Sequence, residues 1–476
     1  MAGKLDRYRS MRDLDASPEP EGVGDPAPDT EAPRFVVQEH HARRLHWDLR
    51  LERDGVLASW ALPRGIPGHP EENRLAVRTE DHPIEYLTFE GEIPAGTYGA
   101  GTMKVWDSGS YSAEKFREDE VIVTLRGGRV SGKYVLFRTR GKDWMIHRMD
   151  PPADPSLEPM PDVVEPMLAR LGKLPREDGA YGFEVKWDGV RAIAHADAGH
   201  LRLTGRNGTD FTPRYPEVRE LAGNLGSRRL ILDGEVVAFD SDGRPSFERL
   251  QSRMHLGSDA AVRRRMGEIP VTYVIFDLLW LDGHSTLALP YQDRRKLLAE
   301  LSLAGPSWRT PGHREGDGAA LLAASEKQGL EGIVAKRLDS AYEPGCRTGA
   351  WLKIKNHLTQ EVVVGGFTAG TGGRAANLGA LAVGIHDQEG RLRYAGKVGT
   401  GFTEATLGVL HRELEALRSP QSPFEGRQPP KGTVFVAPRL VARVEFREWT
   451  RTATLRAPAF KGLVPDVDPA SVVRES

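Results

Sequence analysis

The 476-residue sequence contains a single cysteine, Cys346, so an internal disulfide framework and any metal site built from several cysteines are excluded. Long apolar runs are also missing, because residues 271–281 are interrupted by Asp277 and reach only about half of a membrane span. Neither charge dominates, since 65 Lys and Arg face 67 Asp and Glu, which excludes a uniformly basic coat. The N-terminal residues have no apolar signal core. We therefore expect a soluble protein of a reducing cytoplasm, with no membrane partner.

Two proline-rich stretches divide a chain that is too long for one hydrophobic core. Residues 16–33 hold five acidic residues, five prolines and no lysine or arginine, which predicts a partly disordered N-terminal arm over 1–33. Residues 151–166 hold six prolines, which predicts a stiff, extended linker. Three folded units are therefore expected, at 34–150, 167–358 and 359–470.

The three units differ in periodicity, and together they predict a multidomain α+β protein. Short β-rich runs separated by Gly, Pro and Asp turns fill the first unit, which predicts a small β-barrel or a sandwich. In the second unit, strands forming mixed or antiparallel sheets are expected with helices at 246–254, 293–301 and 318–328. Short strands with one helix near 404–417 predict a closed barrel of the oligonucleotide-binding (OB) type in the third unit.

The most informative segment of the first unit is a polar strand. Side chains alternate with period two, so His46, Asp48, Arg50 and Glu52 share one face while apolar residues share the other. His40 can join this face if the strand continues or bends back. Two imidazoles and a carboxylate suit Mn²⁺ or Zn²⁺, and a guanidinium can hold a phosphate bidentately. From these residues alone, an ordinary solvated strand face remains the alternative.

The run FVVQEHHARRLHWDLRLE, followed by EDHPIEYLTFEGEIPAGTYGAG, resembles the 3′-phosphoesterase module of bacterial DNA ligase D. The resemblance implies that the metal, Mn²⁺ with Zn²⁺ as the alternative, is bound by His40, His46 and Asp48. It implies a catalytic 3′-phosphate site formed by Arg50, Arg74, His82 and Tyr86. The family's N-terminal arm contributes an Arg-Asp pair and a Glu, which match Arg12, Asp13 and Glu19.

The second unit contains five short motifs that place lysines, arginines or carboxylates on strands and turns. Each motif alone is an ordinary half-buried strand or turn with solvated charges, but their joint occurrence favours one phosphate-handling site. The motifs lie at residues 184–191, 204–208, 232–235, 331–336 and 351–355.

In this order the motifs resemble those of the covalent nucleotidyltransferases, which are DNA ligases, RNA ligases and capping enzymes. The resemblance implies that Lys186 takes AMP from ATP as a phosphoramide, which requires a deprotonated amine beside cations that lower its pKa. It implies that Phe276 stacks on adenine and that Glu184 lies beside the purine. The other implied ATP-site residues bind metal or ribose (Glu235, Glu331), ribose or phosphate (Arg191, Arg206), the phosphates (Lys353, Lys355, with Lys336 nearby) and the pyrophosphate (Arg456, Lys461).

Taken together, the two sets of motifs resemble one form of DNA ligase D. That form carries a 3′-phosphoesterase module and a ligase module but no polymerase module. They imply ATP-dependent sealing of DNA nicks and ends with Mg²⁺ or Mn²⁺, in the bacterial cytoplasm at the nucleoid. They also imply Ku and a separate polymerase or primase as partners. One cysteine argues against an NAD-dependent ligase with a four-cysteine zinc module, and the first unit argues against a capping enzyme. A non-catalytic end-binding scaffold and an RNA-repair ligase are the remaining alternatives.

Overall fold

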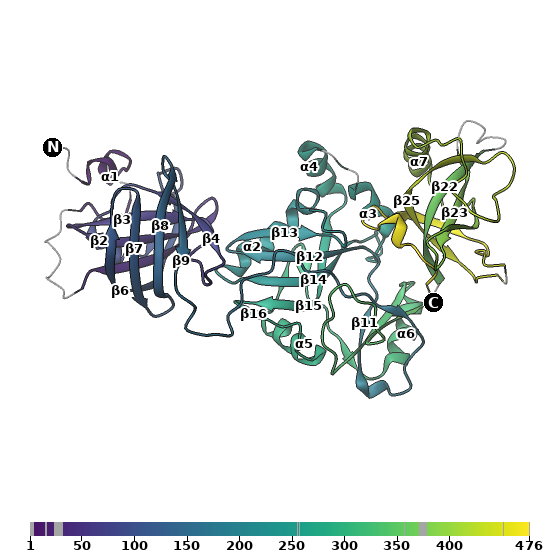
Figure 1. Ribbon diagram of the computed structural model, residues 1–476, viewed down its shortest axis with the longest axis horizontal. Coiled ribbons are helices and arrows are strands. Elements are labelled where there is room, and N and C mark those ends of the chain that lie inside the picture. Colours follow the sequence, from purple (N-terminus) through teal and green to yellow (C-terminus); the bar gives the residue numbers. More distant parts are fainter. Residues whose placement is uncertain are drawn as a thin grey trace.

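The computed structural model places three β-rich units in a row, with the N-terminal unit at one end and the C-terminal unit at the other (Figure 1). No helix among the residues that it describes is long and apolar enough to cross a membrane. The boundaries of the units remain predictions. The described residues are 4–14, 17–22, 32–254, 256, 258–356, 358–370, 378–450 and 452–475.

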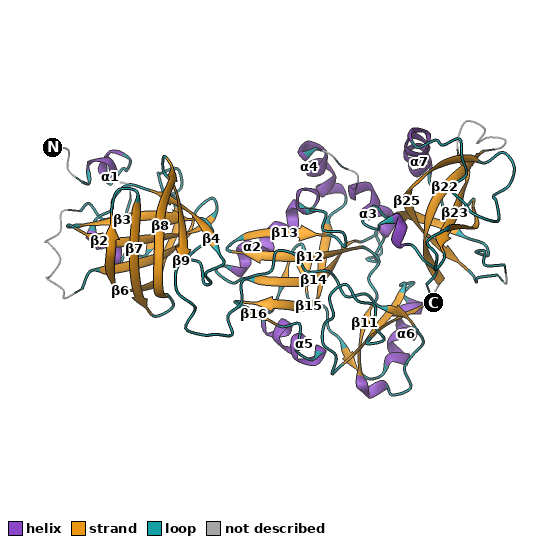
Figure 2. Ribbon diagram, viewed as in Figure 1, coloured by secondary structure: helices purple, strands orange, loops and turns teal. Residues whose placement is uncertain are grey.

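The first unit is a closed antiparallel barrel, built almost entirely of strands (Figure 2). Eight of its nine strands close a ring in the order β1-β2-β3-β4-β9-β8-β7-β6, because β6 also pairs with β1, and β5 extends the sheet at β6. The barrel prediction is confirmed over the sandwich. The strands are β1 (Arg34–His41), β2 (Leu45–Arg53), β3 (Val56–Leu62), β4 (Asn73–Arg78), β5 (Gly91–Ile93), β6 (Gly101–Phe116), β7 (Glu120–Gly127), β8 (Ser131–Arg140) and β9 (Asp143–Arg148).

Both faces of β2 are covered, which the sequence did not predict. Trp47, Leu49 and Leu51 pack into the barrel core, as their alternation predicts. The polar face lies beneath a second apolar cluster, formed where the short helices α1 (Asp6–Ser10) and η1 (Ile84–Leu87) meet the barrel.

The N-terminal arm contributes to this cover. The partly disordered arm remains a prediction, but Glu19 within it is buried, with only 5% of its surface exposed. A carboxylate is rarely buried without a partner, so this burial indicates a specific binding site for Glu19. Residues 15–16 and 23–31 lie outside the described ranges.

The second unit contains two sheets, and their mixed character is confirmed. One has the order β13-β12-β14-β15-β18-β17, with β16 on β15, and the other has the order β10-β21-β20-β11-β19. β15–β18 and β10–β21 are parallel, whereas the remaining pairs are antiparallel. The strands are β10 (Arg170–Leu171), β11 (Tyr181–Val185), β12 (Val190–Asp197), β13 (His200–Thr204), β14 (Leu230–Ala238), β15 (Val271–Leu281), β16 (His284–Ser285), β17 (Ala304–Gly305), β18 (Trp308–Arg309), β19 (Arg314–Glu315), β20 (Gly332–Arg337) and β21 (Trp351–Lys355).

The three helices predicted for this unit are confirmed as α3 (Phe247–Met254), α5 (Tyr291–Glu300) and α6 (Gly318–Lys327). Two further helices, α2 (Glu220–Leu225) and α4 (Asp259–Glu268), were not predicted. α2 is too short to show a helical period, and α4 has a single buried residue, Val262, so it lacks an apolar stripe.

The third unit is a five-stranded antiparallel sheet in the order β24-β23-β22-β25-β26, consistent with the predicted OB fold. A bridge between Thr400 and Ala459 joins its two edges. β25 continues through Pro438 as one strand, because a register shift at Val364/Gly366 absorbs the residues around this proline. The elements are β22 (Leu358–Ala369), β23 (Leu378–His386), β24 (Leu392–Val398), α7 (Glu404–Ala416), β25 (Val434–Phe446) and β26 (Ala459–Leu463).

The proline-rich stretch 151–166 has no regular secondary structure, as expected, but it packs against the second unit. The amide of Glu158 donates to the carbonyl of Gly283 over 2.7 Å, and Val164 is buried in an apolar cluster of that unit. The first two units also touch directly. Arg229 binds Glu72 of the barrel and Asp197 of its own unit, each at 2.8 Å.

Candidate active sites

The first candidate site lies at the end of the β1–β2 hairpin. The antiparallel register places His40 opposite His46 and Gln38 opposite Asp48, so His40 joins the polar face directly across the ladder. His40 Nδ1 lies 3.7 Å from Asp48 Oδ2, and His46 Nε2 lies 3.9 Å from Asp48 Oδ1. One ligand atom from each of the three residues fits within a 4.8 Å cluster.

This cluster fits a cation. Both ring nitrogens of His40 are buried without a hydrogen-bond partner, an arrangement that a bound metal would resolve. The Nδ1 atom of His46 lies 3.0 Å from the carbonyl of Arg44, which orients the ring and leaves Nε2 toward Asp48. Burial alone would raise the pKa of Asp48, but Arg50 and the two imidazoles hold it below its usual range.

Arg50 and His82 stand beside this cluster with groups that can contact a substrate. The guanidinium of Arg50 donates to Asp48 (3.0 Å) and Gln38 (2.8 Å), and its Nη1 atom is buried without a partner. The Nδ1 atom of His82 lies 2.9 Å from the carbonyl of Glu80, which leaves Nε2 facing Arg12 at 3.1 Å. Burial and the two arginines lower the pKa of His82 well below its ordinary value.

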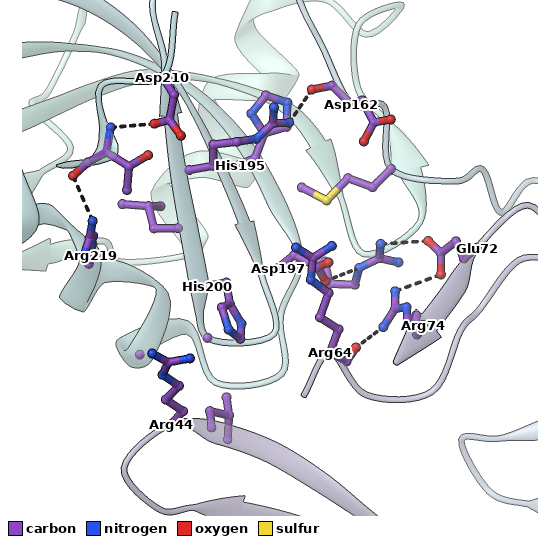
Figure 3. A pocket seen from close by; sticks show the side chains of 18 of the residues that line it. Arg44, Arg64, Glu72, Arg74, Asp162, His195, Asp197, His200, Asp210 and Arg219 are labelled. Carbon is purple, nitrogen blue, oxygen red and sulfur yellow. Dashed lines mark hydrogen bonds and ion pairs between the residues drawn. The ribbon is translucent and has the colours of Figure 1, made fainter. Parts of the chain in front are cut away.

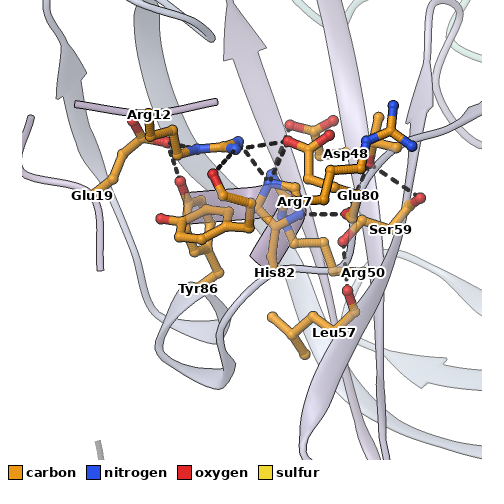
Figure 4. A network of polar contacts seen from close by, with 12 residues as sticks. Arg7, Arg12, Glu19, Asp48, Arg50, Leu57, Ser59, Glu80, His82 and Tyr86 are labelled. Carbon is orange, nitrogen blue, oxygen red and sulfur yellow. Dashed lines mark hydrogen bonds and ion pairs between the residues drawn. The ribbon is translucent and has the colours of Figure 1, made fainter. Parts of the chain in front are cut away.

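The N-terminal arm completes a buried ion network over this site (Figure 4). Arg12 binds Glu19 at 2.7 Å and Glu80 at 2.8 Å, and the hydroxyl of Tyr86 donates to Glu19. The structure thus brings Arg12 and Glu19 of the arm to this site, whereas Asp13 is exposed. Glu80 was missed, although its place beside the Asp-His-Pro turn was a usable signal.

The structure does not bring Arg74 to this cluster. Its guanidinium binds Glu72 at 2.8 Å and the carbonyl of Arg64, beside Trp47 on the core side of β2. Glu72 in turn binds Arg229 of the second unit. The alternation of side chains along β4 explains why Arg74 lies away from the cluster of candidate metal ligands. Arg74 faces into the barrel, where it meets a carboxylate at the barrel end.

The second candidate site forms where β11 ends at Lys186. The amide of Lys186 donates to the carbonyl of Gly332 over 3.0 Å, and its amine binds the carboxylate of Glu331. Lys355 lies 3.8 Å from the same carboxylate. Although burial would raise it, these two lysines lower the pKa of Glu331 to about 2. The structure thus brings three predicted residues together from β11, β21 and the turn before β20.

The predicted adenine residues lie together at the inner end of this site. Lys336 binds Glu184 at 2.8 Å, and its amine lies 4.5 Å from the centre of the Phe276 ring. Arg191 also stands over that ring, at 4.7 Å, and its Nε and Nη2 atoms each donate to the fully buried Asp233 at 2.5 Å. Two tyrosines that the sequence analysis missed complete the wall, since Tyr291 donates to Glu184 and Tyr342 donates to Asp233.

The predicted phosphate lysines meet an unpredicted carboxylate. Glu475 binds Lys353 at 2.8 Å and Lys355 at 3.0 Å. Burial lowers the pKa of Lys353 to about 8, and burial raises the pKa of Glu235 to about 7. Arg206 lies 3.6 Å from Glu361 of the third unit.

The third unit reaches the Lys186 turn through a residue other than those expected. Arg443 on β25 binds Asp188 at 2.9 Å and approaches Glu361 at 3.6 Å. Arg456 instead binds Glu448 at 2.5 Å, and Lys461 binds Glu445 at 2.8 Å. The side chain of Arg456 is 64% exposed and that of Lys461 is 48% exposed, and each pairs with a carboxylate of its own unit.

Three family models match successive parts of the chain. Residues 38–138 match the family of the DNA ligase D 3′-phosphoesterase domain. Residues 166–355 match the ATP-dependent DNA ligase domain, and residues 374–467 match the ATP-dependent DNA ligase C-terminal region.

The chain is also similar to whole proteins and to a solved structure. It is 47% identical over 483 residues to the multifunctional non-homologous end joining DNA repair protein LigD of Mycobacterium tuberculosis, and 36% identical over 530 residues to LigD of Pseudomonas aeruginosa. These alignments cover 100% and 99% of this chain but 62% of each relative, so the chain spans less than two thirds of their length. A structure of a mycobacterial DNA ligase D complexed with ATP and MES is 42% identical, covering 66% of this chain and 98% of that one, with a TM-score of 0.50.

Proposed function

The chain belongs to the DNA ligase D family, and we propose that it heals and seals broken DNA with two separate active sites. The first would be a metal-dependent 3′-phosphoesterase that prepares 3′ ends. The second would be an ATP-dependent ligase that joins a 3′-hydroxyl to a 5′-phosphate in non-homologous end joining. The observation that carries the proposal is that each of two different units gathers its own cluster of chemically matched residues.

In the phosphoesterase, His40, His46 and Asp48 would hold the divalent cation, Mn²⁺ with Zn²⁺ as the alternative. When bound there, a divalent cation supplies Lewis-acid charge at the phosphoryl oxygens. Arg50 would hold the 3′-phosphate through its unpartnered Nη1 atom. Nε2 of His82, which faces Arg12 in this structure, would accept a hydrogen bond from the attacking water once substrate displaces that contact.

The arm residues have a supporting role in this proposal. Arg12 adds positive charge beside His82, and Glu19 and Glu80 hold that guanidinium in place. Tyr86 fixes Glu19 through its hydroxyl and packs against His82 at 4.8 Å between ring centres. A closed ion network of this kind keeps the donors oriented before substrate arrives, which is how preorganised sites stabilise developing charge.

In the ligase, the amine of Lys186 would attack the α-phosphorus of ATP, forming the N–P bond as the bond to the pyrophosphate oxygen breaks. Glu331, with its low pKa, acts as a charge partner rather than as the proton acceptor. Lys353 and Lys355 would hold the phosphates, and Glu235 and Glu331 would bind Mg²⁺ or Mn²⁺. The AMP then passes to the DNA 5′-phosphate, and the 3′-hydroxyl displaces it as the strands are joined.

The decisive experiment uses the Lys186→Ala variant. Incubation with α-labelled ATP should label the wild-type protein and leave the variant unlabelled, while pre-adenylylated nicks should still be sealed in part by the variant. A labelled adduct that persists in Lys186→Ala would refute the ligase assignment. Nicked RNA run in parallel decides between DNA and RNA repair. Ku and a separate polymerase remain proposed partners on the strength of the family alone.

A further inference from the structure

A large cleft lies between the barrel and the second unit, and the β1–β2 turn beside the first candidate active site forms part of its lining (Figure 3). Its volume is about 1240 Å³, and it is lined by the β1–β2 turn, the segment after β3, the β12–β13 hairpin and the region before α2. In Figure 3, Arg44 approaches from the barrel below while His200 and Arg219 face it from the second unit. The cleft is therefore a joint feature of the two units.

The charges in this cleft are arranged to receive an anion. Five of its arginines have no carboxylate within 4.0 Å among the described residues, and they are Arg43, Arg44, Arg64, Arg202 and Arg219. Two of its carboxylates, Glu72 and Asp197, are already neutralised by Arg74 and Arg229. The remaining carboxylates are Glu71, Asp162, Asp210 and Glu220, of which Asp210 accepts from the amide of Thr212 at 2.8 Å.

The cleft is adjacent to the first candidate active site. Arg43 and Arg44 lie in the turn that connects β1 to β2, between the candidate metal ligands His40 and His46. Those ligands lie about two residues from the turn, which corresponds to roughly 7 Å along an extended strand. A nucleic acid strand whose 3′ end occupies the candidate phosphoesterase site can thus reach the turn within a few nucleotides.

The two walls are held at a fixed separation. Ala198, at the tip of the β12–β13 hairpin, is buried in the core cluster of the barrel. Gly199 lies so close to Leu45 that a Cβ at this position would stand 2.8 Å from the Cβ of Leu45. The ion pairs of Arg229 add a second point of attachment. A rigid cleft loses little conformational freedom when a ligand binds.

We propose that this cleft binds the sugar–phosphate backbone of the DNA whose 3′ end enters the phosphoesterase site. The inference rests on the proposed function for its choice of DNA. Guanidinium groups hold phosphate oxygens in pairs and carry no sequence information, so binding here positions any end. The ligase unit thereby supplies one wall of the phosphoesterase's substrate site.

The test uses the full chain carrying Arg202→Ala and Arg219→Ala, two residues of the second unit that contact neither active site. The probe is a fluorescent DNA duplex with a 3′-phosphate, titrated over a range of salt concentrations. Each lost phosphate contact lowers the salt slope by about one, so the variant should have a slope shallower by about two and an affinity about ten-fold weaker at low salt. The matched control removes Arg263 and Arg264, two exposed arginines on α4 of the same unit.

The rates of phosphate release and of AMP-adduct formation distinguish failure of the cleft proposal from failure of the proposed phosphoesterase function. At limiting DNA, the Arg202→Ala and Arg219→Ala variant should release phosphate more slowly than the wild-type protein. At saturating DNA, the two rates of release should be equal. The variant should form the AMP adduct at the wild-type rate. An unchanged salt slope, or an equal loss in the α4 control, would overturn the proposal. If the wild-type protein releases no phosphate, the phosphoesterase assignment fails, whereas the salt slope still tests the cleft.

Discussion

Glu475 occupies the place that we assign to the phosphates of ATP, so replacing it with glutamine should strengthen ATP binding. Burial would raise its pKa, but Lys353 and Lys355 lower it to about 2, from an ordinary 4.5. This net shift, after the opposing effect of burial, corresponds to about 3 kcal/mol in favour of the charged carboxylate. When ATP displaces the carboxylate, water solvates it and offsets part of this free energy. We therefore expect the free energy of ATP binding to improve by about 1–2 kcal/mol in the variant, which is a 5- to 30-fold lower KM for ATP.

The assay is the rate of protein–AMP formation as a function of ATP concentration, with kcat expected to stay near the wild-type value. Glu448→Gln is the matched control, because Glu448 is a carboxylate of the third unit that binds the exposed Arg456. A fall in kcat for Glu475→Gln would mean that Glu475 aligns the lysines for the reaction. An unchanged KM would show that ATP does not displace it. Either result would refute the proposal that Glu475 competes with the phosphates of ATP for Lys353 and Lys355.

Three further predictions follow from the same geometry. Phe276→Ala should raise the KM for ATP about ten-fold or more in the adduct assay, because stacking is worth about 1–3 kcal/mol per base; an unchanged KM would leave Phe276 as a core residue only. The kcat/KM for ATP should fall as the pH rises through about 8, because Lys353 then loses the proton that attracts the phosphates; a flat profile from pH 7 to 9 would contradict this role. His46→Ala or Asp48→Ala should reduce 3′-phosphate release by at least 10–100-fold while nick sealing stays near wild type. Loss of both activities in a folded variant would mean one composite site.

Local sequence patterns were sufficient for the residues that share a strand or a turn. Period-two alternation placed Asp48 and Arg50 on one face, and the antiparallel register then brought His40 opposite His46. The lysine pair of β21 was found in the same way. In each case a single short element fixes the directions of the side chains, so spacing alone carries the information.

No local spacing pattern in the sequence identifies the residues that reach a site from a distant part of the chain. Arg443 lies 255 residues from Asp188 and Glu475 lies 120 residues from Lys355, and isolated charges at such distances are indistinguishable from surface residues. The misplacement of Arg74 has the opposite origin. It was assigned by its motif, whereas the carboxylate of Glu72 and the direction of β4 decide where its guanidinium lies.

The contacts between the first two units change how the linker is understood. Six prolines in 151–166 predict a spacer that leaves the units independent, yet Val164 is buried and Ala198 lies in the barrel core. Arg229 binds the carboxylate of Glu72 across the interface, so removing either unit would take away one of the two ion pairs that each of these largely buried charges makes. A fragment that ends near residue 150 would also expose the apolar surface of Leu45 beside His46. The hairpin that carries the candidate metal ligands is thus supported by the second unit, so the residues of each candidate site are local while the stability of the first site depends on both units.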